Sequence, residues 1–143
     1  MANATSNYPL RPVSVPGYRQ RVGVAASTHI FKGTLVAQLT ADGGLCPGTT
    51  PGSGRAIGVA EHEVNNSNGV IGTKECMMET DRVFILDNAP GADAFTAASL
   101  IGSPAYMVDD HTAANNDNAG ARQIAGVFMG VDAEGVRIHV RVA

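Results

Sequence analysis

The C-terminal end of the chain alternates apolar and polar side chains, and this pattern constrains the fold more than any other feature. The apolar positions are Val136, Ile138, Val140 and Val142, and the polar positions between them are Arg137, His139 and Arg141. Alternation with a period of two is typical of a β-strand with one buried face, so we expect the four apolar side chains in the core. A turn at 132–135 and an apolar run at 124–131 predict that this strand closes a hairpin.

Small residues and glycine favour short strands and tight turns over long helices. The chain has 143 residues, of which 17 are Gly and none is Trp. We predict one all-β domain, a small β-barrel or sandwich of about seven to nine short strands. Residues 77–86 are the longest strand candidate. One short helix is expected at 97–101, with Thr96 as its N-cap and Gly102 at its end.

The first part of the chain shows no periodicity and is rich in proline. Proline fixes φ and removes a backbone donor, so we predict an extended N-terminal arm at 1–21 and a single β-domain at 22–143. Apolar side chains are spread through the arm: Tyr8, Leu10, Val13, Val15 and Tyr18. A frayed terminus is one interpretation. The apolar side chains favour the other, an arm that binds a partner surface, because they need something to bury them.

Charge and cysteine content limit the classes of partner. The formal net charge is −3 and the basic residues are scattered, so no nucleic-acid partner is expected. Cys46 and Cys76 make no disulfide framework, and we expect free thiols. No signal peptide and no apolar run of about 18–20 residues is visible, so we expect a soluble protein that is made in the cytoplasm and has no membrane partner.

The most site-like cluster of the sequence is Asp109-Asp110-His111. Two carboxylates and an imidazole suit a metal site or acid–base chemistry. Adjacent residues on an extended chain point to opposite faces, so we expect these three not to converge. The remaining histidines and the two cysteines lack ligand spacing. The sequence therefore predicts no catalytic residue, no metal site and no cofactor, and a chelator should leave the melting temperature unchanged.

Six segments carry a resemblance to a known family through their order and spacing. They are residues 30–36 (Ile-Phe-Lys-Gly-Thr-Leu-Val), 55–60, 96–102, 105–112, 121–126 and 130–136. In this order the chain resembles phage capsid cement proteins, also called head decoration proteins, of the small all-β type. The resemblance covers about residues 24–142 and leaves the N-terminal arm outside.

This resemblance implies a structural virion protein and not an enzyme. Such a protein binds the outer surface of the assembled head, where major capsid protein subunits meet, as a homotrimer that stabilises the shell. An extended apolar arm suits such bridging, and repetition over a lattice strengthens weak contacts. The alternative is a small-ligand or glycan-binding β-domain, for example a host-attachment module, which needs a pocket of converging polar or aromatic groups. A hydrolase built on residues 109–111 is a third, more distant possibility.

Overall fold

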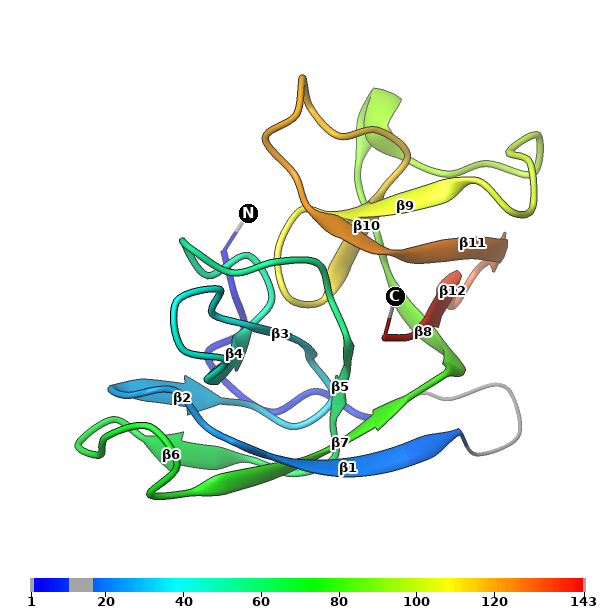
Figure 1. Cartoon of the computed structure of the whole chain (residues 1–143). Coiled ribbons are helices and arrows are strands. Elements are labelled where there is room, and N and C mark those ends of the chain that lie inside the picture. The colour runs from blue at the N-terminus through cyan, green and yellow to red at the C-terminus, as the bar shows by residue number, and fades with distance from the viewer. Residues whose placement is uncertain (1, 11–16, 143) are drawn as a thin grey trace.

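The computed structural model describes residues 2–10 and 17–142 and is almost entirely β (Figure 1). These residues form twelve strands and one 3₁₀ helix, which confirms the all-β prediction. The number of strands exceeds the expected seven to nine because several have only three residues, too few to show alternation. In this part of the chain no helix is long and apolar enough to cross a membrane.

The N-terminal half builds a five-stranded antiparallel sheet in the order β1-β7-β5-β3-β4. Its strands are β1 (Tyr18–Gly23), β3 (Leu35–Gln38), β4 (Leu45–Pro47), β5 (Gly58–Ala60) and β7 (Glu75–Thr80). A separate two-stranded ribbon pairs β2 (Thr28–Ile30) with β6 (Val64–Asn66). Strand β1, which follows the proline-containing stretch in the sequence, is an edge strand of the five-stranded sheet.

The C-terminal half closes into a small barrel in the order β10-β8-β12-β11-β9. Its strands are β8 (Arg82–Asn88), β9 (Pro104–Met107), β10 (Thr112–Ala114), β11 (Ile124–Asp132) and β12 (Gly135–Val140). Only the β8–β10 pair is parallel. Strands β11 and β12 form the predicted hairpin, and Figure 1 shows the barrel above and to the right of the first sheet.

The alternating strand behaves as predicted at three of its four apolar positions. Val136, Ile138 and Val140 are fully buried, whereas Val142 is 55% exposed, which corrects the prediction for that residue. Strand β12 ends at Val140, which pairs with Arg82 at the start of β8. Because the partner strand begins there, the chain beyond Val140 has no ladder to hold its side chains over the core.

The two sheets share one apolar cluster. Leu35 and Val59 of the first sheet belong to the same buried cluster as Phe84 and Ile138 of the barrel. The assignment of residues 22–143 to one domain remains a prediction. A single domain has one hydrophobic core, and this shared cluster fits that requirement.

The predicted helix at 97–101 is absent, which corrects that prediction. The segment forms turns, and the only described helical element is a 3₁₀ turn, η1 (Gly91–Asp93). Thr96 Oγ1 accepts a hydrogen bond from the Ala98 N–H, and the Thr96 N–H donates to Ser99 Oγ. Hydroxyl groups here satisfy the backbone locally, and five residues are too few to repay helix nucleation.

The predicted strand at 77–86 is broken at Asp81, whose φ is 56°. This left-handed residue ends β7 and lets the chain change direction before β8 begins at Arg82. Because β7 belongs to the first sheet and β8 to the barrel, the break takes the chain from one sheet to the other.

Candidate functional site

The N-terminal segment, residues 2–10, lies on the chain's own β-domain. The Tyr8 N–H donates to the Lys32 carbonyl at 2.6 Å, and the Lys32 N–H donates to Asn7 Oδ1 at 2.7 Å. Asn7 Nδ2 also donates to Glu63 Oε1 at 2.9 Å. These bonds attach the segment to the turn before β3 and to the residue just before β6.

Gly33 makes room for this segment. Its φ is +80°, and a Cβ built on it would lie 2.3 Å from the Tyr8 carbonyl oxygen and 3.0 Å from that of Pro9. The obstructing atoms are backbone, so they cannot move without moving the segment. Glycine is therefore required here both for its conformation and for the close approach of the chain.

The segment also covers the loop between β9 and β10, residues 109–111. The Ala4 N–H donates to Asp110 Oδ1 at 2.8 Å, and the Asp110 N–H donates to Asn3 Oδ1 at 3.1 Å. The Tyr8 ring lies 4.3 Å from the His111 ring, centroid to centroid, at an interplanar angle of 35°. The 109–111 loop is therefore a second docking point of the N-terminal segment.

The three side chains of the 109–111 loop converge, which corrects the expectation that they point apart. His111 Nδ1 lies 2.8 Å from Asp110 Oδ1 and 3.3 Å from Asp109 Oδ1. The His111 N–H also donates to Asp109 Oδ1 at 3.0 Å. The chain bends through these residues, so the alternation of an extended strand does not apply to them.

The loop is fixed between the first sheet and the barrel. The Leu35 N–H of β3 donates to the Asp110 carbonyl at 2.7 Å, and the Asp87 N–H of β8 donates to the His111 carbonyl at 2.9 Å. Asp109 and Asp110 are each only 1% exposed. The backbone of two sheets thus holds a pair of carboxylates in the interior.

Burial dominates the electrostatics of this loop. Desolvation raises the pKa of Asp110, because it penalises the charged carboxylate, while hydrogen bonds from His111 and the Ala4 N–H partly oppose the rise. Asp109 Oδ2 is buried and has no hydrogen-bond partner among the described residues. A buried carboxylate oxygen without a partner costs free energy, so this atom needs an explanation.

The predicted arm residues do not form one exposed surface. Tyr8 and Leu10 are half-buried against the chain's own domain, and Leu10 packs on the shared apolar cluster. Tyr18 is 72% exposed, but it begins strand β1 and so does not belong to an arm. Val13 and Val15 lie outside the described residues. The proposed boundary after residue 21 falls inside β1.

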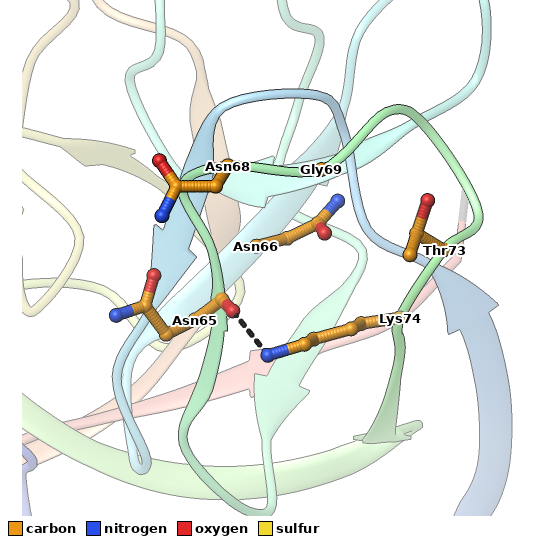
Figure 2. A pocket seen from close by; sticks show the side chains of 6 residues that line it. All are labelled: Asn65, Asn66, Asn68, Gly69, Thr73 and Lys74. Atoms are coloured by element: carbon orange, nitrogen blue, oxygen red, sulfur yellow. Dashed lines mark hydrogen bonds between the residues drawn. The ribbon is translucent and has the colours of Figure 1, made fainter.

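A pocket lies between the β2–β6 ribbon and the loop that follows β6 (Figure 2). Its volume is about 330 Å³, and it is lined by Asn65, Asn66, Asn68, Gly69, Thr73 and Lys74. Lys74 Nζ reaches across it and donates to the Asn65 carbonyl at 2.7 Å. We call this the asparagine-lined pocket. In the sequence, the asparagines and Gly69 indicate only a turn. The folded chain brings Lys74 next to them, which the sequence pattern does not show.

An apolar tip projects from the loop between η1 and β9. Leu100 is 76% exposed and Ile101 is 70% exposed. Backbone hydrogen bonds in both directions tie the loop to β11, from the Gly102 N–H to the Phe128 carbonyl at 2.9 Å and from the Phe128 N–H to the Ser103 carbonyl at 2.8 Å. Both residues were expected at the end of the short helix, and the sequence pattern did not indicate their exposure.

The other histidines and the cysteines stand apart from these sites. His29 Nε2 lies 2.7 Å from Glu63 Oε2, and His139 Nε2 lies 2.8 Å from Asp81 Oδ1. Cys46 and Cys76 are free and buried, which confirms the expected free thiols. Burial raises the pKa of Cys76 to about 11 and also raises that of Cys46.

Comparisons with protein-family models, with curated proteins and with solved structures found no match to this chain.

Proposed function

We propose that this chain is a structural virion protein that binds the outside of an assembled phage head and stabilises the shell where major capsid protein subunits meet. The observation that carries the proposal is the apolar tip. Two adjacent large apolar side chains are mostly exposed on a loop that is hydrogen-bonded to the barrel. Exposed apolar side chains held in a fixed position are typical of a surface that docks on another protein.

The segments that resemble cement proteins support the same proposal. Segment 96–102 contains the apolar tip. Segments 30–36, 55–60 and 105–112 each contribute buried residues to the shared apolar cluster. The resemblance therefore includes part of the shared apolar cluster as well as the loop that we assign to docking.

The tip is a better candidate for the primary contact than the N-terminal arm. Tyr8 and Leu10 already pack against the chain's own domain, so docking through them would first cost those contacts. Leu100 and Ile101 need no such rearrangement. In a homotrimer three tips would act together, and avidity would raise the affinity for a repeating lattice without any new contact.

The test is co-sedimentation of the full chain with empty, expanded heads of its phage. We compare the double variant Leu100→Ser/Ile101→Ser with the matched control Val70→Ser/Ile71→Ser, whose side chains are 70% and 41% exposed on the loop after β6. Loss of two anchors should weaken binding by at least about tenfold, while the control should bind as the wild type does. Equal binding by both variants would refute the role of the tip, and no binding by the wild type would refute the function.

The asparagine-lined pocket favours a second candidate, a small-ligand or glycan-binding domain such as a host-attachment module. Its amides and the Lys74 ammonium are groups that bond to hydroxyls and anions. No aromatic side chain lines it, so the stacking that sugar rings use is not available in this pocket. Binding of host surface polysaccharide by the wild type, lost in Lys74→Ala and retained in the exposed control Lys32→Ala, would support this candidate over the first.

A further inference from the structure

We propose that Asp109, Asp110 and His111 form a binding site for one divalent transition-metal ion, with Zn²⁺ and Mn²⁺ as the best-matched ions. The site lies on the loop between β9 and β10, beneath the N-terminal segment. It is independent of the proposed function, because metal binding at this loop does not require a capsid.

The ligand atoms have the spacing that one ion requires. One oxygen of each carboxylate and one imidazole nitrogen lie within 4.8 Å of one another. The Nδ1 atom of His111 is 2.8 Å and 3.3 Å from the two nearest carboxylate oxygens. Ligands at about 2.0–2.2 Å from one ion, at tetrahedral or octahedral angles, are themselves roughly 3.0–3.5 Å apart. Small shifts of side chains would therefore suffice to enclose an ion.

The loop holds two buried acidic side chains and only one basic side chain, an imbalance that a bound cation would remove. Two carboxylates that are each 1% exposed face a single imidazole. Among the described residues, His111 is the only basic side chain paired with either of them. Asp109 Oδ2 is buried and unpartnered in the same part of the chain. Buried charges are normally paired or bound to metal, and a divalent ion would balance both carboxylates and give the orphan oxygen a partner.

The surroundings orient the proposed ligands. The His111 N–H donates to Asp109 Oδ1, and the Ala4 N–H donates to Asp110 Oδ1. Outer hydrogen bonds of this kind hold carboxylates in a fixed geometry at metal sites. Carboxylate and imidazole ligands together suit zinc and manganese better than calcium, which prefers oxygen ligands alone.

An ion at this position would also strengthen the attachment of the N-terminal segment. Ala4 bonds to one ligand residue, and the Tyr8 ring lies on another. A metal that fixes Asp110 and His111 would fix the surface on which the segment rests. None of the three ligand residues belongs to the shared apolar cluster, so the metal-free protein should remain folded and melt at a lower temperature than the loaded protein.

The first test is calorimetric titration of the chelator-treated full chain with Zn²⁺ and with Mn²⁺. We expect one ion per chain and a higher melting temperature on loading. Asp109→Asn and His111→Gln should each weaken binding by at least about tenfold. His139→Gln is the matched control, since His139 also pairs with an aspartate, Asp81, but on the exposed face of β12. Unchanged affinity in the two loop variants would overturn the proposal.

The second test uses only the wild-type protein, so it does not depend on whether a variant folds. Nitrogen-15 NMR resolves the imidazole nitrogens of His29, His62, His111 and His139 during a Zn²⁺ titration. We expect the Nδ1 resonance of His111 to shift with saturation at one equivalent while the other three rings stay unchanged. If the His111 resonance did not shift, the ion would not bind at this site. Equal shifts of all four rings would show surface binding only. Either result would overturn the proposal.

Discussion

Substitution of Gly33 tests whether the N-terminal segment packs against the turn before β3. We propose Gly33→Ala in the full chain and in a variant that lacks residues 2–10. The new Cβ would lie 2.3 Å from the Tyr8 carbonyl oxygen and 2.8 Å from the Tyr8 carbonyl carbon. In the full chain the segment must therefore leave its seat. In the shortened chain only the left-handed backbone conformation of residue 33 opposes the substitution.

The magnitude follows from these two parts. A left-handed conformation at φ +80° costs a non-glycine residue roughly 1–2 kcal/mol. Displacement of the segment also breaks the Tyr8–Lys32 and Lys32–Asn7 hydrogen bonds, at about 0.5–1.5 kcal/mol each. We expect a loss of about 2–5 kcal/mol in the full chain and of about 1–2 kcal/mol in the shortened chain. Their difference is the coupling between residue 33 and the segment.

Urea unfolding followed by circular dichroism measures both losses. Gly52→Ala is the control, because Gly52 has a φ of +82° and nothing within 4 Å of its added Cβ. It should cost about 1–2 kcal/mol in both chains. Equal losses from Gly33→Ala in the full and the shortened chain would show that the segment does not rest on residue 33.

Three further predictions follow from burial and charge. Val140→Asp should cost several kcal/mol in urea unfolding because it buries an unpaired carboxylate, whereas the exposed Arg141→Ser should cost about 0.5 kcal/mol or less. Cys76, whose pKa is raised to about 11 by burial, should react with a thiol reagent at pH 8 only after unfolding; rapid native labelling would contradict this. The hydrogen bond from His29 lowers the folded pKa of Glu63, so its stabilisation is present above the unfolded pKa of about 4.3 and is lost on acidification. The melting temperature should therefore fall less between about pH 5 and pH 3 in Glu63→Gln than in the wild type.

Local patterns predicted a good part of the fold. The alternation at 136–140 and the turn before it predicted the β11–β12 hairpin, because alternating apolar and polar residues indicate a β-strand with one buried face. The prediction of a helix at 97–101 was wrong, because the hydroxyl groups of residues 96 and 99 accept backbone hydrogen bonds there without a helix.

The candidate sites could be predicted only in part. The Asp109-Asp110-His111 cluster was visible in the sequence, but its convergence depends on a bend held by backbone bonds from β3 and β8. The asparagine-lined pocket forms because the folded chain places Lys74 beside Asn65 and Asn66, several residues earlier in the sequence. No pattern along the chain shows these contacts, because they depend on where separate strands meet.

The all-β class, the C-terminal hairpin and the free state of the thiols could be predicted from the sequence, since each of these follows from local alternation, turn residues or cysteine spacing. The tertiary structure alone decided that a left-handed Asp81 divides one long strand between two sheets and that a proline-containing N-terminal segment returns to its own domain. It also decided that two carboxylates are buried beneath that segment. These features could not be predicted because they depend on contacts between residues far apart in sequence. Such contacts form only when the barrel and the first sheet pack together.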